Sequence, residues 1–222
     1  MRYYPVYLDI QNRNCLVVGG GSVGTRKVET LLKCGATVTV ISPDVSVKLK
    51  ELRDAGVIKL HQRPYRSNDL ERVFLVIGAT DDAKLNRHIS TDADRLSVLC
   101  NIADRPQECN FILPAVIARG DLTISISTSG KSPALAKMLR KRLEDQFGEE
   151  YAVFLQLMGG IRNKLLTQSH EPEAHKELFE KLVNSELLQL IRDNKIAAVN
   201  VLLYEILGDG YDFDNLMRME NV

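Results

Sequence analysis

The sequence predicts an α/β protein whose first half forms a parallel sheet, followed by a β-hairpin with a helix and then by helices alone. Short apolar runs alternate with helical patterns over the first half, as in sheets with crossover helices. A glycine-rich turn joins the first apolar run to the first helical pattern, which makes the sheet Rossmann-type. We therefore expect a Rossmann-type domain over 1–113, a hairpin and helix segment over 114–148, and an all-helical C-terminal domain over 149–222.

The apolar runs of the first half are the expected strands. They lie within residues 14–21, 36–43, 57–65, 72–80 and 96–104. After the first run, Val28, Leu31 and Leu32 recur at helical spacing, and Gly35 provides a C-terminal stop. We expect the second strand to end at Pro43, and the third, interrupted by a proline, to be an edge strand.

The second half begins with two expected strands about a turn at 119–121, because apolar and polar residues alternate in LTISIS. A helix follows, with Ser132 as its N-cap and Pro133 at its first position. From Tyr151 onward the pattern is helical. Breaks are expected near 159–160, 170–172 and 208–210.

Composition argues against several classes of protein. Lys and Arg together number 29, as do Asp and Glu, so net charge indicates no nucleic-acid partner. No apolar run approaches the ~18 residues needed to cross a membrane, and the N-terminus lacks the apolar core of a signal peptide. Four dispersed cysteines without a CxxC pair indicate a reduced cytoplasmic protein with buried thiols. The four histidines form no pair at ligand spacing, so no protein-bound metal is expected.

Gly19, Gly21 and Gly24 form a G-x-G-x-x-G fingerprint between an expected strand and an expected helix. The first glycine permits the tight bend, the second lets the backbone approach a pyrophosphate, and the third packs helix on strand. Ser22 and Val23 begin the helix, whose N-terminus favours phosphate. The turn predicts a dinucleotide site, and a glycine-rich turn without a ligand is the alternative. The fingerprint tolerates alanine in place of Gly24.

The second strand predicts which dinucleotide is bound, because an acid at its end normally takes the ribose hydroxyls. Here the strand ends in Ser42 and Pro43, and Asp44 follows, 20 positions beyond Gly24. No arginine comes directly after Asp44 to hold a 2′-phosphate, which favours NAD over NADP. Asp44 as the N-cap of the next helix is the alternative, and the two roles are compatible.

Polar residues also follow the expected strands at 72–80 and 96–104. Thr80 belongs to GATDD, and Asn101 and Asp104 belong to NIAD. In open parallel sheets ligands bind beyond the carboxyl ends of the strands. We therefore expect Thr80 and Asn101 at the cofactor and Asp104 as a candidate general base. Asp104 as an ordinary turn residue is the alternative.

Cations gather near two expected helix starts. Arg26 and Lys27 follow the glycine turn, and Lys131 lies in the TSGKSP loop, with Lys137 on the helix beyond it. A helix start with free N–H groups favours an anion. Together these cations predict a substrate that bears several carboxylates. A solvated basic face is the alternative for the second group.

The chain resembles the precorrin-2 dehydrogenase/sirohydrochlorin ferrochelatase family, which also forms the N-terminal region of siroheme synthases. The resemblance rests on YPVYLDIQNRNCLVVGGGSVGTRK, VTVISPD, GATDD, NIADRPQECNFILPA and TISISTSGKSPALAKMLRKRLE, in this order. It implies oxidation of precorrin-2 to sirohydrochlorin with NAD⁺. In many members it also implies insertion of Fe²⁺, a substrate and not a bound cofactor, to give siroheme.

The resemblance further implies roles for particular residues. The family's dinucleotide positions fall on Ser22, Val23, Pro43 and Asp44. The aspartate implicated in both reactions falls on Asp104, and members are homodimers joined through the segment that is here 114–128. Thr128 stands where a serine is often found and keeps its hydroxyl, so a substrate contact is expected. The carboxylates of the tetrapyrrole would be held by the two groups of cations.

Two other interpretations stay open. One is a dehydrogenase without chelatase activity, because chelation has no ligand motif of its own. The other is a non-catalytic NAD-sensing domain of the type that gates potassium transport, which also begins with a glycine-rich turn. Such domains usually place an acid directly at the end of the second strand, where Ser42 stands here, so catalysis is favoured.

Overall fold

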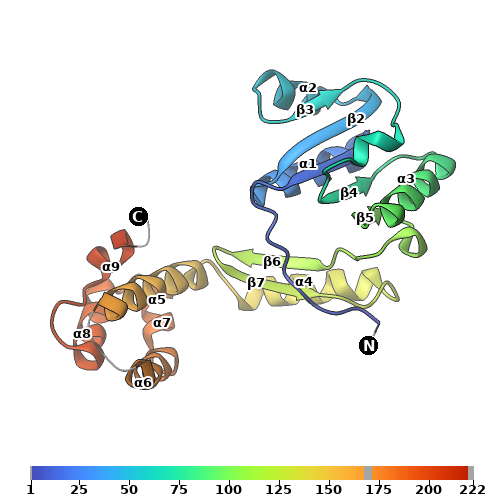
Figure 1. The fold of residues 1–222 in the computed structure, drawn as a ribbon. Coiled ribbons are helices and arrows are strands. Elements are labelled where there is room, and N and C mark those ends of the chain that lie inside the picture. The colour runs from blue at the N-terminus through green and yellow to red at the C-terminus, as the bar shows by residue number, and fades with distance from the viewer. Residues whose placement is uncertain (1, 168–171, 220–222) are drawn as a thin grey trace. The chain divides into compact units, whose positions relative to one another are not determined.

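The computed structural model describes residues 2–167 and 172–219. Its backbone contacts divide the chain into two compact units, residues 1–113 and 114–222. The first unit is a parallel α/β sheet, and the second contains a hairpin and helices, as the sequence predicts (Figure 1). The further boundary expected between residues 148 and 149 stays a prediction.

The first unit is built on a sheet of five parallel strands in the order β3-β2-β1-β4-β5. The strands are β1 (Asn14–Gly20), β2 (Thr37–Val45), β3 (Lys59–His61), β4 (Leu75–Gly78) and β5 (Leu99–Ile102). The helices are α1 (Ser22–Lys33), α2 (Val47–Asp54) and α3 (Ala83–Arg95), with short 3₁₀ turns η1 (Ser67–Leu70) and η2 (Pro106–Glu108). The strand order runs outward from β1 in both directions, which confirms the Rossmann-type prediction.

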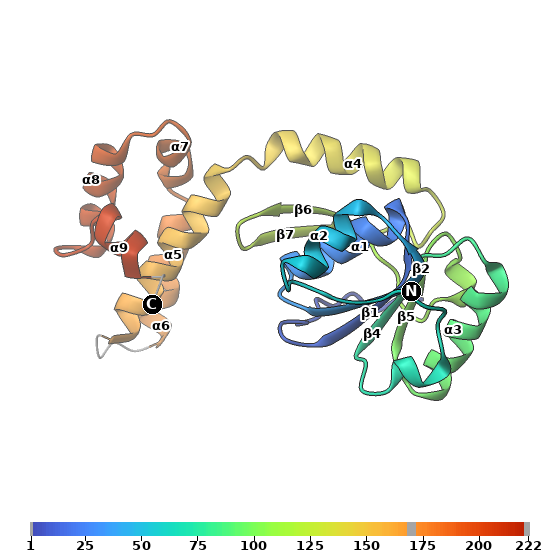
Figure 2. The ribbon, with the colours of Figure 1, turned by 90° about the horizontal axis from the view of Figure 1, so that it is seen from above.

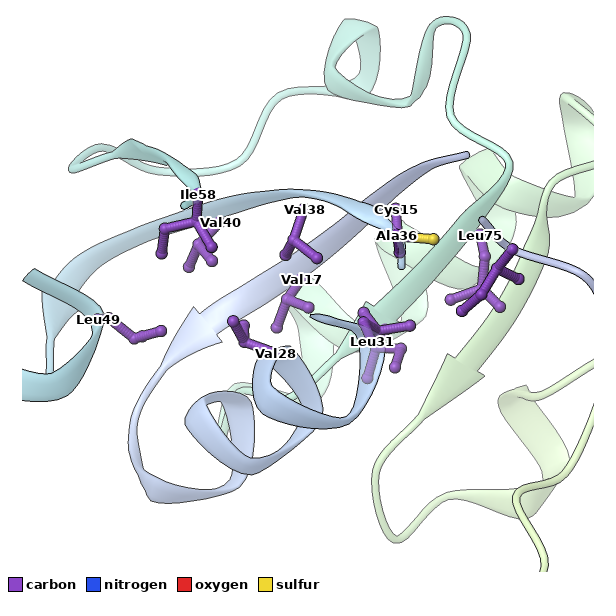
Figure 3. Packing of buried hydrophobic residues seen from close by; sticks show 12 residues of the cluster. Cys15, Val17, Val28, Leu31, Ala36, Val38, Val40, Leu49, Ile58 and Leu75 are labelled. Atoms are coloured by element: carbon purple, nitrogen blue, oxygen red, sulfur yellow. The ribbon is translucent and has the colours of Figure 1, made fainter. Parts of the chain in front are cut away.

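Alternation along β1 builds the two sides of the core. Cys15 and Val17 belong to the side covered by α1 and α2, and Leu16 and Val18 to the side covered by α3 (Figure 2). Figure 3 shows the first side from close by. There the sheet packs on the two helices through Val17, Val38, Val40, Val28, Leu31 and Leu49. With both faces covered, only the edges and ends of the sheet are open to a ligand.

β2 continues past Pro43, where the sequence predicts its end. Ile41 pairs with Val18 of β1, and Val45 pairs with Gly20, so β2 has more residues than β1 between these two pairs. Proline is accommodated in such a bulge because the ladder hydrogen bonds are interrupted there. The strand therefore bends at Pro43 and resumes pairing beyond it.

The N-cap of α2 is Ser46, whose hydroxyl accepts from Leu49 N at 3.3 Å. The N-cap role considered for Asp44 is therefore wrong. Since β2 extends to Val45, the helix begins later than the sequence pattern indicates, and Asp44 lies within the strand.

The second unit begins with an antiparallel hairpin of β6 (Ala115–Arg119) and β7 (Leu122–Ile126), which packs on α4 (Pro133–Gln146). The other helices are α5 (Glu150–Thr167), α6 (Pro172–Val183), α7 (Leu187–Arg192), α8 (Ile196–Leu207) and α9 (Phe213–Met219). Ser132 caps α4 as predicted by accepting from Leu135 N at 3.2 Å. Within the described ranges, the structure contains no helix both long and apolar enough to span a membrane.

α5 runs unbroken through Gly159 and Gly160, where the sequence predicts a break. A side chain at Gly160 would run into the backbone of Leu216 in α9, so this glycine allows the two helices to pack closely. Tertiary packing here outweighs the low helix propensity of glycine. The expected break at 208–210 agrees with the end of α8, and most of the one at 170–172 lies outside the described residues.

The helical core of the second unit yields a test of stability. Leu157 of α5 is completely buried, whereas Leu166 of the same helix is 66% exposed. We expect Leu157→Ala to lower the free energy of unfolding by about 3 kcal/mol, because the cavity cost adds to the lost transfer free energy. Leu166→Ala, the matched control, should change it by less than about 0.5 kcal/mol. Urea unfolding followed by circular dichroism measures both, and equal losses would contradict the packing described.

Candidate functional site

The carboxyl ends of β1, β2, β4 and β5 meet at one edge of the sheet because the strands are parallel. The strand ends and the turns after them span residues 19–24, 42–46, 78–82 and 101–104, and they carry the predicted cofactor residues and Asp104. The other predicted site residues of the first unit, Arg26 and Lys27, lie on α1. β2 and β4 lie on opposite sides of β1, and in open sheets ligands bind outside this switch point. The candidate site is therefore this edge.

Close backbone contacts shape the glycine turn. Gly19 has a φ of +119°, and a side chain there would run into the carbonyl of Ala79 after β4. A side chain at Gly24 would run into the carbonyl of Gly19, so the first turn of α1 lies directly on the bend. Alanine in place of Gly24 therefore requires the backbone to move. The fingerprint tolerates alanine at this position in general, but in this chain the substitution needs that shift.

Gly21 differs from its neighbours, because a side chain added there would meet no atom within 4 Å. This glycine is the exposed N-cap of α1, with a φ of −77° that any residue can adopt. Among the described residues no side chain caps this helix, so the N–H groups of Ser22 and Val23 are available to a ligand. Open space beside uncapped N–H groups fits the pyrophosphate of a dinucleotide.

Hydroxyl groups tie the glycine turn to the turn after β2. Thr25 Oγ1 and Ser46 Oγ lie 2.9 Å apart and share a hydrogen bond, and Ser46 N donates to Gly20 O at 2.9 Å. Ser42 is buried and donates its hydroxyl to Asp44 O at 2.7 Å. Ser42 therefore shapes the bulge of β2, while the Asp44 side chain is exposed at the sheet edge.

The turn after β4 is held from α3. Asn86 of α3 is buried and donates from Nδ2 to Thr80 O at 2.9 Å. Thr80 Oγ1 in turn accepts from Asp82 N at 2.9 Å. Hydrogen bonds from Leu85 N and Lys84 N lower the pKa of Asp82, which caps α3 as an anion. These bonds fix the backbone of the turn on which Thr80 lies.

Sequence reasoning missed Thr25, Ser46 and Asn86. Ser46 could have been found from its N-cap preference, had the end of β2 been placed correctly. Thr25 and Asn86 carry no such local signal, because their hydrogen bonds join segments that only the fold brings together.

Asn101 is buried in β5 and donates from Nδ2 to Phe111 O at 3.1 Å. Its amide nitrogen is therefore used within the protein. The cofactor contact predicted for Asn101 would therefore use its side-chain oxygen, Oδ1. That contact stays a prediction.

Asp104 lies exposed in the turn after β5 with a φ of +60°, an uncommon conformation for a residue with a side chain. Ala103 N donates to Gly78 O at 2.8 Å, which ties this turn to β4. Partial burial lowers the pKa of Lys27 and the charge of Arg26 lowers it further, while the charge of Asp104 opposes them. Lys27 and Asp104 therefore lie near enough to interact, so the predicted base and one predicted anion-binding cation share this edge.

The remaining predicted substrate residues belong to the second unit. Thr128 Oγ1 accepts from Ser132 N at 3.1 Å, and Thr128 O accepts from Lys131 N at 3.0 Å. The loop before α4 is thus closed by hydrogen bonds, with Gly130 at a φ of +79°. Lys131 and Lys137 are exposed at the beginning of the helix. The Thr128 hydroxyl shapes this loop and keeps its proton for a further bond.

The cysteines are free thiols. Burial raises the pKa of Cys15 to about 11 and that of Cys100 to about 12, so both stay protonated near neutral pH. Cys34 is exposed at the end of α1, which corrects the expectation that all the thiols are buried. In the ranges described, no cluster of three or more His, Cys, Asp or Glu could hold a metal ion.

Comparisons with known proteins show the family of this chain. Residues 6–115 match a family described as "Putative NAD(P)-binding", and residues 119–146 match one described as "Sirohaem biosynthesis protein central". A solved structure titled "SirC, precorrin-2 dehydrogenase" is similar, with a TM-score of 0.79 and 28% identity over 92% of this chain and 98% of that one. The chain belongs to the precorrin-2 dehydrogenase and siroheme synthase family. The resemblance seen in the sequence is confirmed.

Two members of this family are siroheme synthases from bacteria. That of Thioalkalivibrio sulfidiphilus is 35% identical over 212 residues, which make up 96% of this chain and 43% of the relative. That of Nitrosococcus oceani is 36% identical over 191 residues, which make up 86% of this chain and 41% of the relative. The chain therefore spans less than half the length of these relatives.

The open space at Gly21 predicts a variant that folds but does not bind the dinucleotide. Gly21→Ala places a methyl group beside the first N–H groups of α1 without a clash in the protein. We expect its thermal midpoint to stay within about 2 °C of the parent chain, and its dissociation constant for NADH to rise at least about tenfold. Fluorescence titration and a thermal melt measure the two quantities.

Gly24→Ala is the contrasting variant, because its side chain would meet the Gly19 carbonyl. It should lower the thermal midpoint as well as the affinity. Unchanged NADH affinity in Gly21→Ala would show that the dinucleotide does not lie at this helix start.

Proposed function

We propose that this chain oxidises precorrin-2 to sirohydrochlorin with NAD⁺ as the hydride acceptor. The observation that carries the proposal is the sheet edge, which holds an uncapped helix start, the Asp44 carboxylate, Lys27 and Asp104, the last two near enough for their charges to interact. The similar solved structure is titled precorrin-2 dehydrogenase and is covered over 98% of its length. The oxidation removes one hydride and one proton, so the site needs a hydride acceptor and a base.

NAD⁺, when bound, supplies the hydride acceptor. The N–H groups of Ser22 and Val23 hold the pyrophosphate, and the exposed Asp44 carboxylate accepts from the ribose hydroxyls. The same carboxylate would repel a 2′-phosphate, which favours NAD over NADP. Pro43 and the bulge set the position of Asp44 relative to α1.

Asp104 is the proposed base. Its carboxylate is exposed beyond β5, at the end of the sheet where the substrate would meet the cofactor. The proton lost from precorrin-2 passes to this carboxylate. Asn, unlike most residues, also adopts a positive φ readily, so Asp104→Asn removes the base while leaving the turn intact.

The cations supply the contacts to the substrate. Arg26 and Lys27 on α1, and Lys131 and Lys137 at α4, are proposed to pair with the carboxylates of the tetrapyrrole, with Thr128 as a hydroxyl contact. Lys27 is partly buried, so its interaction with an anion is screened less than that of a fully exposed cation.

A second activity is proposed for the same site, the insertion of Fe²⁺ into sirohydrochlorin to give siroheme. The iron is a substrate here, and the four ring nitrogens bind it. The protein holds the ring while Asp104 accepts the two protons that the nitrogens release, one at a time, and passes each to solvent. A dehydrogenase without chelatase activity is the alternative, and the two are separated by measuring iron insertion.

The assembly is proposed to be a cytoplasmic homodimer joined through the hairpin of β6 and β7. A two-stranded hairpin is marginally stable alone, and its outer face exposes Val116 together with Ala118. Pairing with a second copy would cover both. Light scattering, which measures the mass of the assembly in solution, tests the proposed dimer. No contact with nucleic acid or membrane is proposed.

The central test is an anaerobic assay with precorrin-2 and NAD⁺, followed by addition of Fe²⁺. We expect NADH and sirohydrochlorin to form, and then siroheme to appear faster than without protein. Asp104→Asn should lower kcat for the first step by about 10²–10⁴-fold, the usual contribution of a general base, with unchanged NADH affinity.

Three outcomes of this assay are informative. Sirohydrochlorin without accelerated iron insertion would leave a dehydrogenase alone. Tight NADH binding without turnover of precorrin-2 would favour a sensing domain. Full activity of Asp104→Asn in both steps would remove Asp104 from the mechanism.

Charge reversal tests the proposed substrate contacts in the second unit. Lys131→Glu should raise KM for precorrin-2 about tenfold or more, with little change in NADH affinity, because a repulsive charge replaces an attractive one. Lys50→Glu on the exposed face of α2 changes the net charge equally and should leave KM within twofold. Steady-state kinetics at fixed ionic strength measures both values of KM. Equal increases would show that Lys131 acts only through the net charge of the protein and does not contact the substrate.

A further inference from the structure

The chain after Asp104 folds back along β5, which is an edge strand of the sheet. Asn110 N donates to Cys100 O at 3.1 Å, and Asn110 Oδ1 accepts from Cys100 N at 2.7 Å. Asn110 Nδ2 donates to Val98 O at 3.0 Å. The side chain and backbone of Asn110 thus bond to Cys100 on the open edge of β5 and to Val98 just before the strand. The preceding residue, Cys109, lies against the turn that carries Asp104.

The thiol of Cys109 contacts both ends of that turn. Ile102 N donates to Cys109 Sγ at 3.1 Å. The thiol in turn lies 3.2 Å from Arg105 O and 3.4 Å from Ile102 O, and its single proton is donated to one of them at a time. Residues 102 and 105 are the first and last residues of the turn, since Arg105 N donates to Ile102 O at 3.3 Å.

Asp104 depends on this turn for its position. Its φ of +60° lies in the left-handed region, which is uncommon for residues with a side chain but which aspartate adopts more readily than most. In the described part of the chain, no hydrogen bond holds the Asp104 side chain. The carboxylate is therefore placed by the backbone of 102–105, which the Cys109 thiol and the bond from Ala103 N to Gly78 O restrain.

The thiol is in the right state for this task. Burial raises the pKa of Cys109, and the charge of Glu108 acts in the same direction against the hydrogen bond from Ile102 N. The thiol therefore keeps its proton near neutral pH and can donate to a carbonyl while its sulfur accepts from Ile102 N.

We propose that Cys109 is a positioning residue for Asp104. The Cys109 thiol joins the two ends of the turn and thereby orients the Asp104 carboxylate. The proposal rests on the proposed function, because it acts through the base role of Asp104. Cys109 is not proposed to touch the substrate or the cofactor. Its loss should change the rate of proton removal and leave cofactor binding unchanged.

Cys109→Ala and Cys109→Ser form the matched pair for the test, because they leave similar volume but only serine keeps a donor and an acceptor. We expect Cys109→Ala to lower kcat for precorrin-2 oxidation about tenfold, the order of loss caused by misplacing a catalytic group. Cys109→Ser should keep at least about half of the parent kcat, and both should bind NADH within twofold of the parent. Cys34→Ala, an exposed cysteine away from the turn, is the control and should keep full activity.

A double-mutant cycle separates positioning from a general loss of structure. In the Asp104→Asn background, Cys109→Ala should cause no further loss of kcat, because the group that it positions is already gone. A further tenfold loss there, or equal losses in the alanine and serine variants, would overturn the proposal. If the parent chain does not turn over precorrin-2, the proposed function itself is overturned. If the parent chain is active and the Cys109→Ala variant is fully active too, only the positioning role is overturned.

A measurement on folded protein covers the case in which Cys109→Ala does not fold. Methyl methanethiosulfonate converts the thiol to a methyl disulfide with release of methanesulfinate, which removes the S–H donor. In the Cys34→Ala chain, modification of Cys109 at alkaline pH, where part of the thiol ionises, is quantified by mass spectrometry. It should lower kcat in proportion, and dithiothreitol should restore it. Full kcat with modified Cys109 would contradict the proposal.

Discussion

The close approach of three backbone segments at the glycine turn is the constraint on which the rest of the site depends. Gly19 lies against the carbonyl of Ala79, and Gly24 lies against the carbonyl of Gly19. These contacts place the start of α1 directly on the ends of β1 and β4, so that its N–H groups open at the switch point of the sheet. Any side chain at either glycine would separate α1 from the sheet and move the helix dipole away from the ligand.

The other turns at this edge are each held by a polar side chain from a neighbouring segment. Ser46 joins the turn after β2 to α1, Asn86 holds the turn after β4, and Cys109 holds the turn after β5. Each is buried or partly buried and bonds to a backbone group or to another turn, which restrains the turn that it contacts. The exposed residues proposed for chemistry, Asp44 and Asp104, thus lie on segments that hydrogen bonds tie to their neighbours.

This arrangement separates the groups that hold the structure from those that meet ligands. Ser42 and Asn101, predicted at the cofactor, are buried and use their polar atoms largely within the protein. Asp104 by contrast has an exposed side chain on a left-handed backbone, a conformation that is uncommon outside glycine and that occurs at functional sites. Lys27, partly buried beside it, brings a positive charge to the edge where an anionic substrate would bind.

The sequence by itself determined the fold class, the family and the order of the parallel strands along the chain, because these depend on local periodicity and on motifs of fixed spacing. Only the tertiary structure decided how far β2 and α5 extend. Pro43 locally favours the end of a strand, and Gly160 the end of a helix. In the folded protein a bulge accommodates Pro43, and close packing against Leu216 accommodates Gly160. Tertiary structure also decided that Lys27 and Asp104 lie near enough for their charges to interact, because the sheet brings these two segments together. It decided as well that the Cys109 thiol bonds to both ends of the turn that carries Asp104.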